Sequence, residues 1–489
     1  MTDRIPEEVP NLIQGKDVPA RSGRSAEKQN PATGNLLCRL ARSGPEDVAA
    51  AVEAARGAQP AWEEMPAVQR GMALHDVIDL MKSRKEEIAE IVALETGKSP
   101  KEALGETLGA IQCGLFFAGE GQRLYGRTCT SGVPDKYAMT VRQAVGVAGL
   151  IIAANTPIAN VAWKVFPALI CGNAVVLKAA EDTPATAWLV GRIAREAGLP
   201  DGVLNIVQGL GPEAGASLVA HEDVGVISFT GSTAVGRTIA EVAGRRLARV
   251  SLELGGKNAL VVCDDADLEH AATWVLLSAF SNAGQRCASA GRIVVFDQVY
   301  DRFKEMLIEK TGNLRVGPTD RDDFGPVINL RQLEHMTAAV SRAVEEGARL
   351  LTGGARITGP GLDRGYYMAP TLLENVDPGA HISVTELFGP IACLYRAQGF
   401  EHALNLVNDS PYGLTACIHT TNVHRAVAFA GKVKTGVAVV NAGTYGSEPH
   451  MPFGGLKQSG NGTREPGTEA LDVYSELKDI YITTNPKAV

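Results

Sequence analysis

Residues 145–152 read VGVAGLII, an apolar run that ends at a polar break around Asn155. The run has the length of a buried strand, and the residues from the break through Trp163 have a helical pattern. Helical stretches separate further short apolar runs, which lie at residues 174–177, 204–207, 226–229 and 259–262. Strands that alternate with helices predict a parallel, doubly wound α/β sheet.

The pattern extends in both directions from this core. Residues 44–104 have helical periodicity, and a second α/β unit is expected from near Ala271, with strands at residues 292–296 and 391–395. Residues 136–142 and 480–483 alternate as exposed edge strands do, and such strands can add to the sheet edge of a partner. The sequence therefore predicts two α/β units and a separate pair of β segments.

The composition narrows the class of protein. The chain of 489 residues suggests about three domains. Its net charge of −8 (47 Lys and Arg, 55 Asp and Glu) argues against nucleic acid or an anionic membrane as partner. The longest apolar run, residues 144–161, contains Asn155 and Asn160 and falls short of a membrane span. Eight cysteines without a C-x-x-C pair, and no signal peptide in residues 1–11, predict reduced thiols in a cytoplasmic protein.

Two glycine-containing turns are candidates for holding a phosphate. The first, residues 209–211, has G-x-G-x-x-x-G spacing and is followed by Pro212, which favours an ordinary helix-entry turn. The second, Gly231 and Ser232, lies between an apolar run and a helix, where hydroxyl and amide donors suit a pyrophosphate. Ser232 fits equally well as a helix cap, so both interpretations stay open.

A carboxylate and a thiol are the candidates for reactive chemistry. Glu253 stands at an apolar strand end, where an unpaired carboxyl would have a raised pKa and act as a base, and a lysine-paired one would be structural. Cys287 lies beside Arg286 at the expected start of a helix, a setting that lowers a thiol pKa, although most single cysteines are packing residues. The histidines form no protease signature, and the absence of HExxH, P-loop and EF-hand motifs disfavours metal chemistry.

Seven short motifs follow one another along the chain. They are Asn155, Leu177-Lys178 with Glu181, Phe229 to Ser232, Leu252 to Lys257, Gly284 to Cys287, Glu386 to Pro390, and Pro452 to Gly460. In this order they resemble the NAD(P)-dependent aldehyde dehydrogenase superfamily over nearly the whole chain. The spacing of Glu253 and Cys287, 287 − 253 = 34 residues, is also similar to that of the family. Any one motif can arise by chance, but seven in order cannot.

The resemblance implies that the chain oxidises an aldehyde to a carboxylic acid with NAD(P)⁺ and water. Cys287 would attack the aldehyde, while the side-chain amide of Asn155 and the backbone N–H of Cys287 would form the oxyanion hole. A hydride would pass to the nicotinamide, and Glu253 would activate water to hydrolyse the resulting thioester. These are the steps of the hydrolytic, non-acylating type of the family.

The resemblance also assigns the cofactor contacts. A carboxylate at Glu181 would repel a 2′-phosphate, so NAD is favoured, although relatives with this residue can also use NADP. Lys178 and Glu181 would hold the adenosine ribose, Gly231 and Ser232 the pyrophosphate, and Glu386 the nicotinamide ribose, with Phe388 near the ring.

The residues around Asn155 depart from the family's pattern. The family often has Pro-Trp before this asparagine and an aromatic residue after it, where this chain has Ala153-Ala154 and Thr156; its usual Lys-Pro-Ser-Glu reads KAAE at residues 178–181. A substrate funnel more polar than usual would be lined by Thr156, Asn160, Thr444 and His450, beside the retained Trp163. This predicts a functionalised aldehyde, such as a semialdehyde.

The family's fold implies an aldehyde dehydrogenase-like α/β architecture of two doubly wound parallel-sheet domains and a β oligomerisation element. The Rossmann-like cofactor domain would span residues 1–122 and 145–255, the catalytic domain 256–469, and the oligomerisation element 123–144 and 470–489. A homodimer or homotetramer is expected. Three alternatives are a CoA-acylating relative, a cofactor-free thiol hydrolase and a non-catalytic binding protein; the presence of both Glu253 and Cys287 disfavours the first and third.

Overall fold

The apolar run at residues 145–152 forms strand β8 (Val147–Ile151), buried along its whole length within a seven-stranded sheet. The computed structural model describes residues 4–488. Parallel pairing runs through the order β12-β11-β8-β9-β10, as the alternation of strands and helices predicts. The other parallel strands are β9 (Ala174–Lys178), β10 (Leu204–Val207), β11 (Val224–Thr230) and β12 (Arg249–Glu253).

Helices cover both faces of this sheet, which is why β8 is a continuous apolar run. Ala148 and Leu150 share a core with α2 (Ala67–Ser83), α3 (Lys85–Thr96), α4 (Pro100–Glu120), α5 (Pro157–Ile170) and α6 (Pro184–Glu196). Val147 and Ile151 point to the opposite face, as alternate strand residues must, and share a core with α1 (Pro45–Glu64), α7 (Ala216–Ala220) and α8 (Thr233–Gly244). The sheet is therefore the middle layer of three.

The N-terminal segment completes the edge of the first sheet. Strand β2 (Asn11–Ile13) pairs antiparallel with β10 and with β3 (Lys16–Val18), so the sheet is mixed rather than purely parallel. A separate three-stranded sheet of β1 (Glu8–Val9), β5 (Leu36–Ala41) and β4 (Ser25–Gln29) lies beside it. Across residues 4–488, no helix has the length and apolar character needed to cross a membrane.

A second seven-stranded sheet has the order β15-β16-β17-β14-β13-β19-β20, parallel except at β15. Its strands are β13 (Asn258–Val262), β14 (Ala290–Phe296), β15 (Arg349–Thr352), β16 (Thr371–Glu374), β17 (Ile391–Ala397), β19 (Thr415–His419) and β20 (Val437–Val440). The second unit thus begins at β13, before Ala271, because an apolar run does not reveal which sheet it joins. The helices are α9 (Leu268–Phe280), α10 (Asp297–Gly312), α11 (Leu330–Glu345), α12 (His381–Val384), α13 (Phe400–Asn408) and α14 (Val423–Lys432).

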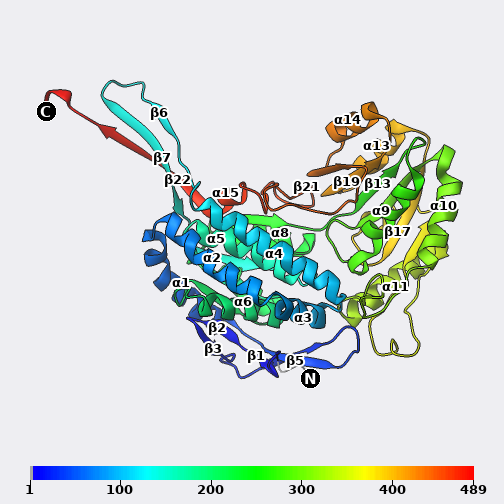
Figure 1. The fold of residues 1–489 in the computed structure, drawn as a ribbon, viewed down its shortest axis with the longest axis horizontal. Helices are drawn as coiled ribbons and strands as arrows, with labels where there is room; N and C mark the ends of the chain where they lie inside the picture. The colour runs from blue at the N-terminus through cyan, green and yellow to red at the C-terminus, as the bar shows by residue number, and fades with distance from the viewer. Residues whose placement is uncertain (1–3, 489) are drawn as a thin grey trace.

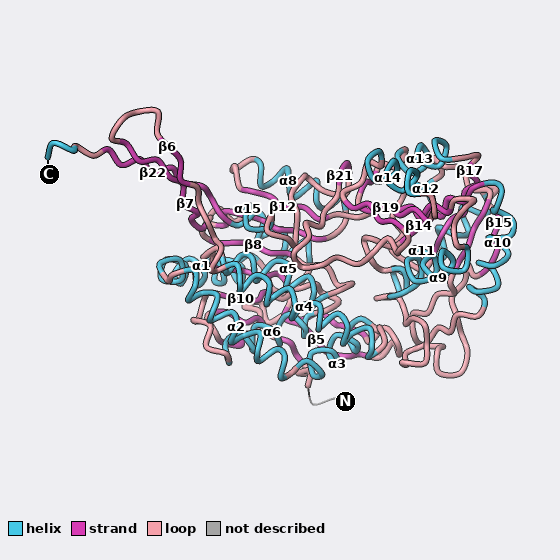
Figure 2. Tube along the Cα trace, turned by 45° about the horizontal axis from the view of Figure 1, so that its top comes forward, coloured by secondary structure: helices cyan, strands magenta, loops and turns pink. Residues whose placement is uncertain are grey.

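A three-stranded antiparallel arm projects from the body with the C-terminus, as both ribbon and tube show (Figures 1 and 2). Strands β7 (Lys136–Ala144) and β22 (Ser475–Thr483) pair along their full lengths, and β6 (Thr128–Thr130) adds to β7. The two segments that the sequence presents as separate edge strands are therefore partners of each other. The short helix α15 (Ala470–Tyr474) leads into the arm, and β18 (Tyr412–Gly413) pairs with β21 (Leu456–Lys457) between the two units.

Candidate active site

The two large sheets face each other through opposite strand ends. In the first sheet, Asn155 follows β8, Ser232 follows β11 and Glu253 ends β12, all at the carboxyl ends of parallel strands. In the second sheet, Cys287 precedes β14 and Phe388 precedes β17, at the amino ends. A cavity of about 370 Å³ is lined by all five residues. Open α/β sheets bind ligands at the carboxyl ends of their strands, so this cavity is the natural place for a site.

Cys287 follows a tight turn, and the prediction that it starts a helix is wrong. The turn Ser281–Gly284 precedes it, and β14 begins three residues after it. Asn282 and Ala283 both have φ of +53°, and Gly284 has φ of +66°. Consecutive left-handed residues cannot continue an α-helix. A Cβ at Gly284 would lie 2.2 Å from the carbonyl oxygen of Gly389, so glycine is required there.

The thiol of Cys287 is held in its protonated form by its surroundings. Burial, with the carboxyls of Glu386 and Glu253 nearby, raises the pKa of the Cys287 thiol to about 12. Arg286 does not offset this effect, because its guanidinium donates a hydrogen bond to the carbonyl of Ser281 at 3.0 Å. The expected lowering of the thiol pKa by a helix end and a cation is therefore wrong for this state of the protein.

The side-chain amide of Asn155 lies next to the cysteine loop. Its Nδ2 donates to the carbonyl of Gln285 at 3.0 Å, two residues before Cys287. Its backbone carbonyl accepts hydrogen bonds from Lys98 Nζ at 2.9 Å and from Asn282 Nδ2 at 3.3 Å. The loop after β8 is thus tied directly to the loop before β14, and an amide donor is presented to the same cavity as the thiol.

The carboxyl of Glu253 is buried and has no hydrogen-bond partner on either oxygen. Burial raises the pKa of Glu253 well above 4.5, and the nearby carboxyl of Glu465 raises it further, while Lys164 and Arg464 oppose the shift. The ammonium of Lys164 is instead hydrogen-bonded to Glu465 at 2.6 Å. Of the two interpretations of Glu253, the structure supports the unpaired carboxyl with a raised pKa.

The turn after β11 provides an open helix N-terminus. Ser232 caps α8 by accepting a hydrogen bond from the N–H of Val235 at 3.4 Å. Gly231 packs against the ring of Phe229, which a Cβ would approach to 2.4 Å. Both Gly231 and Ser232 line the cavity, so the serine is a helix cap and also lies where a pyrophosphate would meet the positive end of the helix.

Of the two carboxylates predicted to hold the riboses, Glu386 lines the cavity, whereas Glu181 and its partner Lys178 lie outside its lining. Lys178, at the end of β9, is paired with Glu181 at 2.7 Å. Glu386 accepts a hydrogen bond from the N–H of Gly256 at 3.0 Å, and a Cβ at Gly255 would lie 2.0 Å from its carboxylate. Burial raises the pKa of Glu386 to about 7. Backbone glycines, a helix N-terminus and hydrogen-bonding carboxylates are the groups that fit a dinucleotide with two riboses and a pyrophosphate.

Three of the five residues predicted for the substrate funnel line the cavity. They are Thr156, Asn160 and Trp163, whose ring lies 5.4 Å from that of Phe453. The structure does not bring the other two to the cavity. Thr444 is buried and donates to the carbonyl of Ala288 at 2.6 Å, behind the cysteine loop. The side chain of His450 is 57% exposed and lies 3.6 Å from the carboxylate of Glu448.

Several lining residues did not emerge from the sequence. Gln332 and His335 lie on α11, one helical turn apart, and belong to no recognisable motif. Phe453 and Leu387 also line the cavity. They lie inside the motifs at residues 452–460 and 386–390, and these motifs are the sequence signal that could have identified them.

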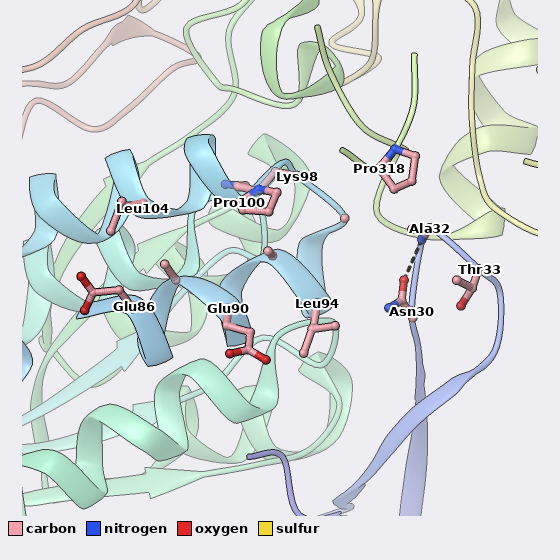
Figure 3. A pocket seen from close by; sticks show the side chains of 13 residues that line it. Asn30, Ala32, Thr33, Glu86, Glu90, Leu94, Lys98, Pro100, Leu104 and Pro318 are labelled. Carbon is pink, nitrogen blue, oxygen red and sulfur yellow. Dashed lines mark hydrogen bonds between the residues drawn. The ribbon is translucent and has the colours of Figure 1, made fainter. Parts of the chain in front are cut away.

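A second cavity, of about 480 Å³, lies between the turn at residues 30–33, helices α3 and α4, and Pro318 (Figure 3). It is larger than the first, but its lining is mostly apolar and includes no cysteine among the described residues. The candidate turn at residues 209–211 leads into a short helical segment, Gly211–Gly215, as the interpretation as a helix-entry turn predicts. We therefore place the site in the cavity that contains Cys287.

The fold and the site together define an α/β protein with a thiol, an amide donor and an unpaired carboxyl at the junction of two sheets. The model of the aldehyde dehydrogenase family matches residues 18–480, and the chain belongs to this family. The chain is 38% identical to the alpha-ketoglutaric semialdehyde dehydrogenase of Bacillus subtilis over 96% of this chain and 97% of the relative. It is 37% identical to the betaine aldehyde dehydrogenase of Mesorhizobium japonicum over 98% of each chain.

Solved structures agree with this assignment. The betaine aldehyde dehydrogenase of Staphylococcus aureus in complex with NAD⁺ has a TM-score of 0.95 and 32% identity, over 98% of this chain and 95% of that one. An NADP-dependent enzyme of E. coli has a TM-score of 0.93 and 35% identity, over 98% of each chain. The aldehyde dehydrogenase fold expected from the motifs is confirmed.

Proposed function

We propose that the protein oxidises an aldehyde to a carboxylic acid with NAD(P)⁺ and water, through a covalent adduct on Cys287. The observation that carries this proposal is the meeting of three groups in one cavity: the thiol of Cys287, the amide of Asn155 and the unpaired carboxyl of Glu253. A nucleophile, an oxyanion donor and a base are the groups that acyl chemistry on a thiol requires.

The chain's own residues act in two stages. The thiol of Cys287 loses its proton to solvent, its sulfur adds to the aldehyde carbon, and the resulting oxyanion accepts hydrogen bonds from Asn155 Nδ2 and from the N–H of Cys287. A nicotinamide bound in this cavity would supply the hydride acceptor, and loss of the hydride would leave a thioester on the sulfur. Glu253 then takes a proton from water, whose oxygen adds to the thioester carbon. The C–S bond breaks, the acid leaves, and the sulfur takes the proton that Glu253 removed from water.

The residues that would hold the cofactor come from both sheets. Lys178 and Glu181 would bind the adenosine ribose, Gly231 and Ser232 the pyrophosphate, and Glu386 the nicotinamide ribose, with Phe388 near the ring. Glu181 favours NAD because its carboxylate repels a 2′-phosphate. Its pairing with Lys178 at 2.7 Å offsets part of that repulsion and is consistent with some use of NADP. In this proposal residues 1–122 and 145–255 form the cofactor domain and 256–469 the catalytic domain.

The polar residues of the cavity support a functionalised aldehyde as substrate. Asn160 Nδ2 donates to the carbonyl and hydroxyl oxygens of Thr156 at 2.9 and 3.0 Å, which leaves the Asn160 carbonyl oxygen as an acceptor toward the cavity. No Lys or Arg lines the cavity among the described residues. A semialdehyde remains the first substrate class to test, and a neutral hydrogen-bonding aldehyde is the second.

The arm supports a homo-oligomer, either dimer or tetramer. Its strands expose large apolar side chains, which burial against a second copy would stabilise. They are Tyr137, Val141, Leu477, Tyr481 and Ile482. We also propose a cytoplasmic location. All cysteines in residues 4–488 are free thiols, which is consistent with a reducing compartment.

Formation of NADH or NADPH across a panel of alkanals, aromatic aldehydes and ω-carboxy semialdehydes tests the proposal. Selective turnover of one class with NAD supports it and names the substrate class. Turnover that requires CoA would replace water with CoA as acceptor, and absence of dinucleotide binding would contradict the cofactor assignment.

A further inference from the structure

A buried ion pair lies behind the loop that carries Asn155. Lys98, between α3 and α4, and Glu106, on α4, have side chains only 3% and 7% exposed and are in contact with each other. Lys98 lies at the turn that borders the cavity of Figure 3. Its ammonium also donates to the backbone carbonyl of Asn155 at 2.9 Å. Removing charged groups from water costs free energy, so a buried ion pair is stable only where further hydrogen bonds offset this cost.

Glu106 supplies the missing cap of helix α5. The side chain of Thr156, the N-cap residue of α5, accepts no hydrogen bond from a backbone N–H of the first turn. Oε1 of Glu106 accepts hydrogen bonds from the N–H groups of Ile158 and Ala159 at 3.1 and 3.3 Å. These are donors that a helix cannot satisfy internally, and a carboxylate is favoured at this end of the helix. Glu106 therefore fixes the segment directly after Asn155, while Lys98 fixes Asn155 itself.

Glu102 makes the corresponding contact to the cysteine loop. It lies one turn before Glu106 on the same face of α4, as residues four apart must. Its Oε1 accepts a hydrogen bond from the N–H of Asn282 at 3.0 Å and lies 3.8 Å from the guanidinium of Arg286. The next residue, Ala283, has a left-handed backbone with φ of +53°, a conformation that costs an alanine energy and persists where neighbouring contacts impose it.

We propose that Lys98, Glu102 and Glu106 are positioning residues that set the Asn155 amide against Cys287. One helix face thereby holds both halves of the oxyanion hole, although the two loops belong to different sheets. The inference rests on the proposed function of Asn155 and Cys287.

The test compares Lys98→Met, Glu106→Gln and the double variant K98M/E106Q, which removes both charges at nearly constant volume. Misplacement of the amide should lower the single-turnover rate of NADH formation about 10- to 100-fold. The rate of Cys287 alkylation by iodoacetamide should stay within about twofold, because that reaction forms no oxyanion. Glu102→Gln should also lower the single-turnover rate of NADH formation and leave the rate of Cys287 alkylation within about twofold.

A matched control is Glu95→Gln. Glu95 is also buried and caps a helix from a distance, accepting from the N–H groups of Ala185 and Thr186 at the start of α6. This variant should lower the melting temperature comparably and leave the single-turnover rate at saturating NAD unchanged. An equal loss of rate in Glu95→Gln would mean that the effect is general destabilisation.

Double-mutant cycles with Asn155→Ala show whether Lys98 affects the rate of NADH formation through the Asn155 amide. If Lys98 acts through the Asn155 amide, K98M should have almost no further effect in the Asn155→Ala background, because residues that act as one unit are not additive. Additive losses overturn the inference while leaving the proposed function intact. A wild-type protein that forms no NADH from any aldehyde overturns the proposed function and the inference with it.

Discussion

Replacing Glu253 with glutamine separates the two stages of the proposed reaction. Glutamine keeps the shape of the side chain and removes the base. General bases contribute about 10²- to 10⁴-fold, so hydrolysis of the thioester should slow by that factor. Acylation should proceed at its normal rate or faster, because the carboxylate of Glu253 is one of the charges that raises the pKa of Cys287. We expect one NADH per active site, followed by a stall.

The fold should tolerate the change. Neither carboxyl oxygen of Glu253 has a hydrogen-bond partner, so the substitution leaves no protein donor unsatisfied. The new buried NH₂ group costs about 1–3 kcal/mol if it finds no acceptor. Because the pKa of Glu253 is raised in the folded state, its contribution favours the folded state at low pH and is lost as the pH rises through the folded pKa. Glu253→Gln should therefore gain stability relative to the wild type as the pH rises above about 4.5.

The assay is stopped-flow NADH absorbance with excess aldehyde, compared with Glu95→Gln as a buried-carboxyl control. After the excess aldehyde has been removed, hydroxylamine should cleave the stalled thioester of Glu253→Gln and release about one hydroxamate per active site. Normal steady-state turnover without hydroxylamine would refute the role of Glu253. A variant that shows no burst would place the requirement for Glu253 before the thioester instead.

Other substitutions test the remaining assignments. Cys287→Ser should lower turnover on the order of 10⁵-fold while NAD binding, followed by calorimetry, is retained; substantial dehydrogenase activity would rule out the thiol as nucleophile. Glu181→Gln should raise the NADP-to-NAD ratio of kcat/KM by roughly 3- to 10-fold, a modest effect because the carboxylate is 41% exposed, and an unchanged ratio would remove Glu181 from the ribose site. Leu477→Asp on the arm should give monomers in light scattering with a change in unfolding free energy within about 0.5 kcal/mol; an unaltered oligomer would exclude this surface.

The parallel strands could be predicted from the sequence because their burial on both faces leaves a plain signal. The alternation of Ala148 and Leu150 with Val147 and Ile151 serves two cores at once, so the whole run is apolar. The same signal could not assign β13 to its sheet, since strands of either sheet look alike. The pairing of β7 with β22 was also hidden, because their registers join segments more than 300 residues apart.

The residues of the candidate site could be predicted where a reactive residue type lies inside a motif. They could not be predicted where tertiary packing sets the backbone or the direction of a side chain. The sequence around Cys287 identifies the thiol, but its backbone follows from the close approach of Gly284 to Gly389, which no local pattern shows. Thr444 and His450 are polar and lie near the motif at residues 452–460. Thr444 nevertheless donates a hydrogen bond to the carbonyl of Ala288, and the side chain of His450 faces solvent. Their nearness to this motif in the sequence does not show whether their side chains point into the cavity.

The raised pKa values in the cavity suggest an order of events. Cys287, Glu253 and Glu386 are close enough that ionisation of either carboxyl raises the pKa of the thiol. Because the pKa of Glu386 is raised to about 7 and that of the thiol to about 12, increasing the pH ionises Glu386 before the thiol. The resting site therefore opposes the simultaneous presence of a charged base and a charged nucleophile. A positive charge entering the cavity would relieve this opposition by stabilising thiolate and carboxylates together. Since an aldehyde is neutral and the oxidised nicotinamide ring is a cation, attack on the aldehyde is expected after the dinucleotide has bound.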